Sequence, residues 1–404
     1  MSAPLDGLLV VSIEQAVAAP LCTRHLADLG ARVIKIESVD GGDFTREYDN
    51  VVLGMAAHFV WLNRNKESVA LDLKSSRGRE VLEQLLGRAD VVVQNLGPGA
   101  AKRLSIAAPD VVRRFPSVVA VDISGYGTGG PYDDRRAYDV LAQSEGGSCA
   151  ITGWPGRPAK PGIPVADVGA AMYALTSILA ALHARHDTGR GAAVSVCLLD
   201  VIAEWMGFAL NQTRYGNAAP QPSGVSSPMV APYGAYPTND GDTVVLGTTN
   251  DAEFRRLAEM IGEPQLADDP SLIGNARRVN ARRRLDETIT RWTSQRSLTQ
   301  VQTAAHEHRI GYARLNQVAD VLSHPQLTER HRWVAVGSPV GPISALLPPF
   351  DSEQWTIRTD SVPALGEHSA AVLSWLGYPE PVIDELTAAG LVGTPTTNTS
   401  TTQG

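Results

Sequence analysis

The sequence predicts an α/β protein whose large domain is a parallel β-sheet with helices on its faces. Short β-branched runs alternate with helical segments through the first 130 residues, which is the pattern of a parallel sheet. The amino-acid composition then changes near residue 215, where proline, glycine and serine become frequent. A chain of 404 residues is also longer than one hydrophobic core usually serves, so we expect a second, smaller domain.

The alternating segments can be placed in order along the chain. Strands are expected at "LLVVSIE" (8–14), "ARVIKIE" (31–37), "SVALDLK" (68–74), "DVVVQNLG" (90–97) and "SVVAVDISGYG" (117–127). Helices are expected at "APLCTRHLADLG" (19–30), which Gly30 closes, and at "SSRGREVLEQLLGRA" (75–89), which starts with serine. Each helix therefore connects two strands of one sheet.

The second half of the chain contains a linker, a hairpin and further helices. The segment "RYGNAAPQPSGVSSPMVAPYG" (214–234) predicts a linker, and Asn239-Asp240-Gly241 predicts the turn of a β-hairpin. Polar helices follow to about residue 320, and two more helices precede the low-complexity tail. We assign 226–320 to the small domain and expect 393–404 to be disordered.

Composition excludes several classes of function. The chain is 43% hydrophobic and 19% charged, as ordinary globular proteins are, and its net charge of -8 without a basic run argues against a nucleic-acid partner. Cys22, Cys149 and Cys197 are widely spaced, and the histidine pairs lack carboxylate or cysteine companions. We expect a cytoplasmic, reduced protein with no metal, no signal peptide and no membrane-spanning segment.

Glycines and cations follow the expected strands. Ligands of open parallel sheets bind at the carboxyl ends of the strands. There, "QNLGPGAAKRL" offers the backbone of Gly97 and Gly99 with the side chains of Asn95, Lys102 and Arg103. Other strand ends add further cations, namely Lys74, Arg135 and Arg136. These groups favour an extended ligand with several phosphates, although the loop alone is equally typical of a simple turn beside a solvated helix face.

One carboxylate stands out, because Asp167 lies where a proline-glycine loop gives way to the apolar helix "GAAMYALTSILAAL". A carboxylate at a helix start usually caps the first turn. The same position would keep it ionised at neutral pH on a rigid element, as a nucleophile toward an activated acyl carbon requires. The residues alone leave both roles open.

Seven ordered motifs resemble the family III CoA-transferases, over about residues 5–392. They are "LADLGARVIKIE", "RNKESVALDLK", "ADVVVQNLGPGAAKRL", "ISGYGTGGPY", "AYDVLAQSEGG", "GIPVADVGAAMYALTSILAALHARHDTGRG" and "PALGEHSAAVLSWLGY". The resemblance implies a Rossmann-like large domain built from 1–215 and 325–392, a small inserted domain, and an interlocked homodimer. A single monomeric species in sedimentation at micromolar concentration would contradict the dimer.

The resemblance also assigns the site residues. Asp167 matches the family's catalytic aspartate. The residues that match CoA-binding segments are Leu71, Asp72, Leu73, Lys74, Asn95, Leu96, Gly97, Arg103, Arg136, Ala137, Tyr138 and Asp139. CoA carries a diphosphate and a 3′-phosphate, which agrees with the ligand that the strand ends favour. CoA and acyl-CoA would be substrates, with no tightly bound cofactor.

The implied reaction moves CoA from an acyl-CoA donor to a carboxylic acid through a covalent aspartyl-CoA thioester on Asp167. The alternatives are an α-methylacyl-CoA racemase and a non-catalytic acyl-CoA-binding protein. The racemase branch has a histidine acid/base where this chain has Tyr138, which favours the transferase.

The later segments indicate the class of acid. "APYGAYPTNDGDTVVLG", "GYARLNQVADVLSHPQL" and "GPISALLPPF" resemble the branch that handles C4 and C5 dicarboxylic acids such as succinate, mesaconate, itaconate or citramalate. The candidate cations for the distal carboxylate are Arg46, Arg64 and Arg314, each of which is equally typical of a surface arginine. The glycine-run loop of formyl-CoA transferase has no counterpart in 216–262.

Overall fold

The computed structural model describes residues 3–216 and 218–395, and this part of the chain forms two compact units. The first unit contains the residues up to 146, 162–206 and the residues from 329 onward. The second unit contains 147–161 and 207–328. Residues 147–161, 207–215 and 325–328 therefore lie in the second unit, whereas the sequence assigned them to the large domain.

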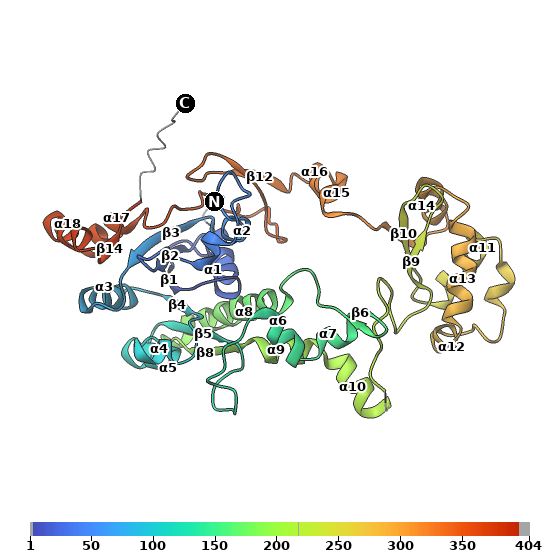
Figure 1. Ribbon diagram of the computed structural model, residues 1–404, viewed down its shortest axis with the longest axis horizontal. Coiled ribbons are helices and arrows are strands. Elements are labelled where there is room, and N and C mark those ends of the chain that lie inside the picture. The colour runs from blue at the N-terminus through green and yellow to red at the C-terminus, as the bar shows by residue number, and fades with distance from the viewer. Residues whose placement is uncertain (1–2, 217, 396–404) are drawn as a thin grey trace. The chain divides into compact units, whose positions relative to one another are not determined.

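A large, mostly parallel sheet forms the centre of the first unit (Figure 1). Within the described residues it has seven strands in the order β14-β3-β2-β1-β4-β5-β8. The strands are β1 (Leu9–Ile13), β2 (Arg32–Glu37), β3 (Lys66–Leu71), β4 (Val91–Gln94), β5 (Val119–Ser124), β8 (Ala193–Cys197) and β14 (Val392–Gly393). The order reverses between β1 and β4, as in doubly wound sheets, so the ends of these strands are the expected ligand site. The prediction of a parallel sheet is confirmed.

The sheet is covered by helices on both faces. One face packs against α3 (Ser76–Leu86), α5 (Ala108–Arg114), α17 (Ser369–Leu376) and α18 (Glu380–Ala388) through a continuous aliphatic core. The opposite face packs against α1 (Ala18–Asp28) and the long α8 (Val165–Thr188). The first unit also contains η1 (Phe44–Glu47), α2 (Ala57–Asn63), α4 (Ala100–Arg103), α6 (Asp139–Glu145), α9 (Leu198–Trp205), β12 (Trp333–Val336) and β13 (Ile343–Leu346).

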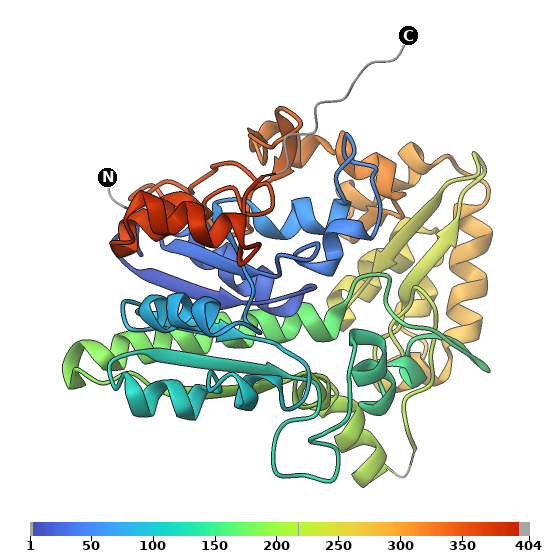
Figure 2. The ribbon, with the colours of Figure 1, turned by 60° about the vertical axis from the view of Figure 1, so that its left-hand side comes forward.

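The two ends of the described chain meet on this sheet. Figures 1 and 2 show the red helices α17 and α18 beside the blue first strands. β14 pairs antiparallel with β3, and the Ser369 hydroxyl accepts a hydrogen bond from the Ala70 backbone N–H at 3.1 Å. The sequence predicted disorder from residue 393, but Gly393 belongs to this strand. Residues 396–404 lie outside the described part of the chain.

The second unit is built around a small antiparallel sheet. Its strands are β9 (Tyr233–Pro237), β10 (Thr243–Gly247) and β11 (Gly311–Arg314), and residues 238–242 form the predicted hairpin turn between β9 and β10. The remaining elements are α7 (Ser148–Ile151), β6 (Gly153–Trp154), β7 (Arg157–Pro158), α10 (Gly207–Gly216), α11 (Asp251–Met260), η2 (Pro264–Ala267), α12 (Asn275–Asn280), α13 (Arg282–Thr293), α14 (Leu298–Glu307), α15 (Val318–Leu322) and, at the end of its chain range, α16 (Pro325–Glu329).

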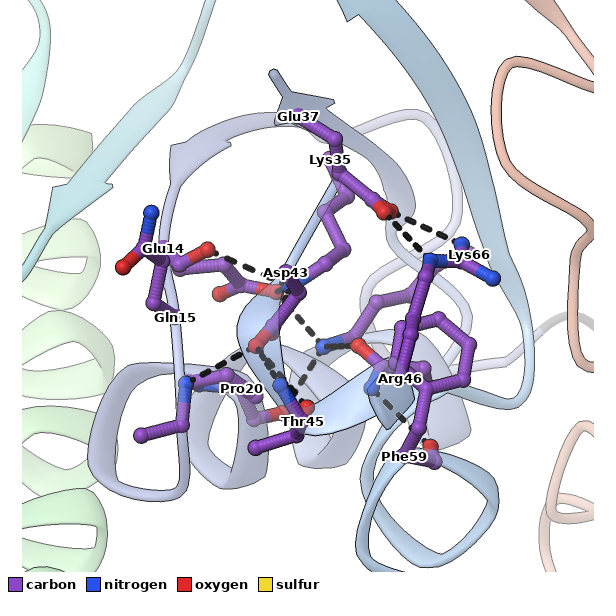
Figure 3. A network of polar contacts seen from close by, with 12 residues as sticks. Glu14, Gln15, Pro20, Lys35, Glu37, Asp43, Thr45, Arg46, Phe59 and Lys66 are labelled. Atoms are coloured by element: carbon purple, nitrogen blue, oxygen red, sulfur yellow. Dashed lines mark hydrogen bonds and ion pairs between the residues drawn. The ribbon is translucent and has the colours of Figure 1, made fainter. Parts of the chain in front are cut away.

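Four buried charges cluster on one face of the sheet, from the loops after β1 and β2, from within β2 and from the first residue of β3 (Figure 3). We call Glu14, Lys35, Asp43 and Lys66 the buried tetrad. Lys35 Nζ lies 2.8 Å from Asp43 Oδ2, and Lys66 Nζ lies 2.7 Å from Glu14 Oε1. Strand periodicity places Glu14, Lys35 and Lys66 on the α1 face, opposite the aliphatic core.

The tetrad is electrically balanced, which is how its buried charges are tolerated. Burial alone would raise the pKa of Glu14, but Lys66 and Lys35 outweigh it and hold that pKa below its usual range. Burial would likewise lower the pKa of Lys35, but Glu14 and Asp43 raise it. Burial dominates at Lys66 and lowers its pKa to about 8. Each charge therefore depends on its partners.

The long helix α8 has the length and apolar character that a membrane-spanning helix would have. Core helices of globular proteins share these properties. Here its small residues, among them Gly169, Ala170 and Ala174, are buried, and α8 packs along α1 and against β5. The structure thus uses α8 as a packing element of the first unit.

Replacement of Glu14 by glutamine should leave two buried lysines with one carboxylate between them. We expect Glu14→Gln to lower the free energy of unfolding by about 3–5 kcal/mol, because breaking a buried pair strands a desolvated charge. The measurement is urea denaturation followed by circular dichroism. Arg77→Ala is the control, because its ion pair with Glu80 is about half exposed; a change within about 0.5 kcal/mol is expected there. Equal effects of the two variants would contradict the tetrad's role.

Candidate active site

A pocket of about 410 Å³ lies at the carboxyl ends of β1, β2, β3 and β4. Six of the predicted CoA-binding residues line it: Leu71, Asp72, Leu73, Lys74, Leu96 and Arg103. They come from the loops after β3 and β4, which neighbour β2 and β1 in the sheet. The carboxyl ends of neighbouring parallel strands meet at one edge of the sheet, so residues that lie far apart in the sequence come together there.

Two of the cations that line the pocket, Lys74 and Arg103, are exposed. The nearest carboxylate to Lys74 is that of Asp40 at 4.0 Å, in a pair open to water. Such a pair contributes little, so Lys74 remains able to meet a ligand phosphate. A diphosphate would be held by these cations together with backbone N–H groups.

Sequence reasoning missed Arg79, which also lines the pocket. Its guanidinium donates hydrogen bonds to the carbonyl oxygens of Leu73 at 3.2 Å and Lys74 at 2.7 Å, and so fixes the loop after β3. The sequence does contain a signal for this role. Ser75 marks the start of α3, and Arg79 follows one turn later, within reach of the loop after β3. A Cβ at Gly78 would lie 2.1 Å from the Asp72 carbonyl oxygen, so only glycine allows this close packing.

Asn95 and Gly97 are not among the residues that line the pocket. The Asn95 side chain instead holds the turn after β1. Its Oδ1 accepts a hydrogen bond from the Gln15 backbone N–H at 2.9 Å, and its Nδ2 donates to the Gln15 carbonyl oxygen at 2.8 Å. Gln15 in turn lines the pocket.

Asp167 lies in the first turn of α8, but Asp139 caps that helix. Asp139 Oδ1 accepts hydrogen bonds from the backbone N–H groups of Ala166 at 2.9 Å and Asp167 at 3.4 Å. Gln143 Nε2 donates to the other oxygen of Asp139 at 2.6 Å. Among residues 3–216 and 218–395, no hydrogen bond or ion pair engages the Asp167 carboxylate. The capping role that the sequence left open for Asp167 therefore belongs to Asp139.

The half-buried Asp167 carboxyl is harder to ionise than the sequence suggested. Burial, and then the negative charge of Asp139, raise the pKa of Asp167 to about 7. The sequence suggested a carboxylate that stays ionised at neutral pH, whereas a pKa of about 7 leaves it only partly ionised there. The sequence could not show this, because Asp139 is 28 residues away in the chain.

Two tyrosines lie near this carboxylate pair. Tyr138 is 61% exposed and immediately precedes Asp139. Partial burial and the charges of Asp43 and Asp167 raise the pKa of the Tyr48 hydroxyl. Asp43 also lines the pocket, so Tyr48 lies within electrostatic range of both the pocket and Asp167.

Arg136 and Ala137 complete the predicted segment 136–139. Arg136 is exposed. Ala137 packs so closely on Gly125 that a Cβ at Gly125 would lie 1.9 Å from the Ala137 Cβ. The loop that carries Tyr138 and Asp139 is thereby held against the end of β5.

The three arginines proposed for a distal carboxylate already have partners. Arg46 forms a two-point pair with Glu37 at 2.8 and 2.9 Å, and Arg64 forms one with Asp28 at 2.8 Å. Arg314 lies in the second unit, 2.9 Å from an Asp242 oxygen. Their observed role is structural.

Metal ligands are not clustered in the described ranges. Within 3–216 and 218–395, no group of three or more His, Cys, Asp or Glu side chains has an arrangement that could hold a metal ion.

Comparison with known proteins identifies relatives along nearly the whole chain. The model of "CoA-transferase family III" matches residues 5–369. The succinyl-CoA–D-citramalate CoA-transferase of Chloroflexus aurantiacus is 30% identical over 376 residues, which cover 92% of this chain and 93% of the relative. The succinate–glutarate CoA-transferase of Agrobacterium fabrum is 30% identical, with 92% and 96% covered.

A solved structure shares the fold. The crystal structure of a CaiB/BaiF family protein from Brucella suis superposes with a TM-score of 0.81 at 30% identity. The match covers 93% of this chain and all of that chain.

Proposed function

The chain belongs to CoA-transferase family III, and from this premise we propose that Asp167 carries a covalent CoA intermediate during transfer between two acids. One observation supports the assignment above the others. Asp167 presents a half-buried carboxylate without a hydrogen-bond partner among the described residues, at the start of a rigid helix whose capping is done by Asp139. Such a carboxylate is free to act as a nucleophile.

The first half of the reaction would load the enzyme. An Asp167 oxygen attacks the thioester carbon of the donor acyl-CoA, the C–S bond breaks, and an acyl-aspartyl anhydride and CoA thiolate result. The thiolate then attacks the aspartyl carbon of the anhydride. The C–O bond breaks, the donor leaves as a carboxylate, and Asp167 becomes an aspartyl-CoA thioester.

The second half reverses these steps with another acid. The acceptor carboxylate attacks the aspartyl thioester and expels CoA thiolate, and the thiolate attacks the acceptor carbon of the new anhydride. The products are the acceptor acyl-CoA and the Asp167 carboxylate. Every nucleophile is an anion and no proton is consumed, so only ionised Asp167 can start the cycle.

We propose C4 and C5 dicarboxylic acids as the substrates. The names of two relatives, which specify succinyl-CoA with citramalate and succinate with glutarate, support this class. Transfer from succinyl-CoA should be faster to such diacids than to monocarboxylic acids of equal length. Equal rates for the two series would contradict the substrate class.

Hydroxylamine trapping tests the covalent step. The enzyme is incubated with succinyl-CoA and hydroxylamine, and peptides are analysed by mass spectrometry. We expect a hydroxamate on the peptide that contains Asp167, because hydroxylamine attacks the aspartyl carbonyl carbon of the thioester and displaces CoA thiolate. Asp167→Ala should lack the adduct and lose at least about 1,000-fold in transfer rate, since the nucleophile is gone.

An unmodified Asp167 peptide from an enzyme that transfers CoA would contradict the mechanism. Deuterium exchange at the α-carbon of 2-methylacyl-CoA, without transfer, would instead indicate the racemase. Asp167→Asn is the matched variant, because it keeps the shape of the side chain and removes the nucleophile.

The pH dependence of transfer follows from the carboxylate pair. Since the pKa of Asp167 is about 7, kcat/KM should fall about tenfold for each pH unit below 7. Asp139→Asn removes the neighbouring negative charge but keeps an oxygen for the Ala166 N–H. It should lower the pKa of Asp167 and move the fall in kcat/KM to lower pH.

The control is Asp240→Asn, which changes a helix-capping aspartate of the second unit. Asp240 Oδ2 accepts the Leu298 backbone N–H at 3.0 Å at the start of α14. Its pH profile should match the wild-type profile. A wild-type profile in Asp139→Asn as well would mean that Asp139 does not set the ionisation of Asp167.

A further inference from the structure

One stretch of chain between β4 and α5 carries several of the residues that line the pocket. We call residues 95–107 the β4–α5 segment. Its pocket residues are Leu96, Ala100, Arg103 and Leu104. Arg103 is exposed, and within 3–216 and 218–395 no ion pair engages its guanidinium. The position of this cation therefore follows from the backbone of the segment that carries it.

The β4–α5 segment contains little regular structure to hold its shape. Helix α4 within it is only four residues long. Gly99 before α4 and Ser105 after it have φ values of 72° and 57°. Ser105 has a Cβ, and such residues seldom adopt this left-handed region. The segment therefore depends on contacts with other elements.

Asp122, in the middle of β5, supplies such contacts at both ends of the segment. Its two oxygens accept the Ala108 backbone N–H at 2.9 and 3.0 Å, and so cap α5, whose own N-cap residue Ala107 has no side-chain acceptor. At the other end, Asp122 Oδ1 accepts a hydrogen bond from Gln94 Nε2 at 2.8 Å. Gln94 Oε1 then accepts the Leu96 backbone N–H, also at 2.8 Å. One carboxylate thus ties down both ends.

The tie through Gln94 is enclosed by the fold. Gln94 is buried, and it lies directly opposite Asp122 in the pairing of β4 with β5. A buried carboxamide depends on its protein partners, because water does not replace a bond that is lost. A carboxylate is well suited as the anchor, since hydrogen bonds to a charged acceptor are stronger than those between neutral groups.

We propose that Asp122 is a positioning residue for acyl-CoA binding, which acts through both ends of the β4–α5 segment and so sets the position of Arg103 in the pocket. Asp122 does not line the pocket, so it would not touch the ligand. This inference rests on the proposed function, because it takes CoA as the ligand. The benefit is preorganisation, since a segment that is already fixed loses little conformational entropy when the ligand binds.

Binding and kinetics of Asp122→Leu test this role. Leucine has a similar size and no acceptor, so both ties are lost. Titration calorimetry should show CoA bound about tenfold more weakly than by wild type, the range of one or two hydrogen bonds. Steady-state transfer from succinyl-CoA should show KM raised by a similar factor and kcat within about twofold, because Asp167 is held by α8.

Double-mutant cycles separate positioning from a general loss of structure. The combined effect of Asp122→Leu and Arg103→Ala on the dissociation constant should be smaller than the product of the single effects, because Asp122 then has no cation to position. Lys74→Ala is the matched comparison. Lys74 follows β3 and lies outside the β4–α5 segment, so its effect should multiply with that of Asp122→Leu.

Two further variants complete the set. Asp122→Asn keeps Oδ1, which accepts from both Gln94 and Ala108, and should restore most of the affinity that Asp122→Leu loses. Should Asp122→Leu not fold, Gln94→Met enters the same cycles, since it breaks the tie to Leu96 and leaves the cap of α5 in place.

Multiplying effects of Asp122→Leu and Arg103→Ala would overturn the inference, even in an enzyme that transfers CoA, as would equal coupling in the Lys74 cycle. Wild-type protein that binds no CoA at millimolar concentration would overturn both the inference and the proposed function. Coupling confined to Arg103 in a protein that forms no aspartyl adduct would uphold the inference and overturn the proposed chemistry alone.

Discussion

The buried tetrad is the constraint on which the strand-end architecture depends. Polar and charged groups enter a protein interior at a high cost in free energy, and Glu14, Lys35, Asp43 and Lys66 are tolerated only because they satisfy one another. Their side chains come from the strands β2 and β3 and the loops after β1 and β2. A packing that removed one of these charges from its partner would leave the others unpaired as well. The tetrad therefore favours one arrangement of the segments that carry it.

The buried tetrad contributes to the wall of the pocket. Glu14 and Asp43 have atoms in its wall, while their charges are neutralised by the lysines behind them. The carboxylates of the tetrad therefore repel an anionic ligand less than their number suggests. Lys74 and Arg103 are exposed beside these carboxylates and would supply positive charge to a bound phosphate.

The carboxylates at the start of α8 divide two tasks between them. Asp139 satisfies the N–H groups of the first turn, which is the usual work of a helix-start carboxylate. Asp167 is then left without a partner, and burial beside a like charge makes its ionised form less stable. A less stable anion is a more basic one, so the arrangement that raises its pKa also suits a nucleophile that must accept an acyl group.

Much of the fold could be predicted, because hydrophobic periodicity and turn residues are local signals. The alternating strands and helices of the first 130 residues and the turn at Asn239-Asp240-Gly241 were found in this way. β14 was missed, since it is two residues long and exists only through its pairing with β3. β11 was missed for a similar reason, because its exposed residues show no alternation.

The sequence predicted which residues belong to the candidate site better than it predicted what each of them does. Lys74 and Arg103 follow strands, and such positions can be read from the sequence. The role of Asn95 depends on Gln15, which lies 80 residues away, and the ionisation of Asp167 depends on Asp139. Contacts of this kind are created by folding and leave no trace in local spacing.

The protonation of Asp167 is the property on which the proposed chemistry rests most directly. Carbon-13 NMR of enzyme labelled at the aspartate side-chain carboxyl carbon, with Asp167→Asn to assign the signal, would follow its titration from pH 4 to 9. A midpoint near 7 is predicted. A midpoint near 4, as for an exposed aspartate, would show that burial and Asp139 do not act on this carboxyl, and would contradict the account.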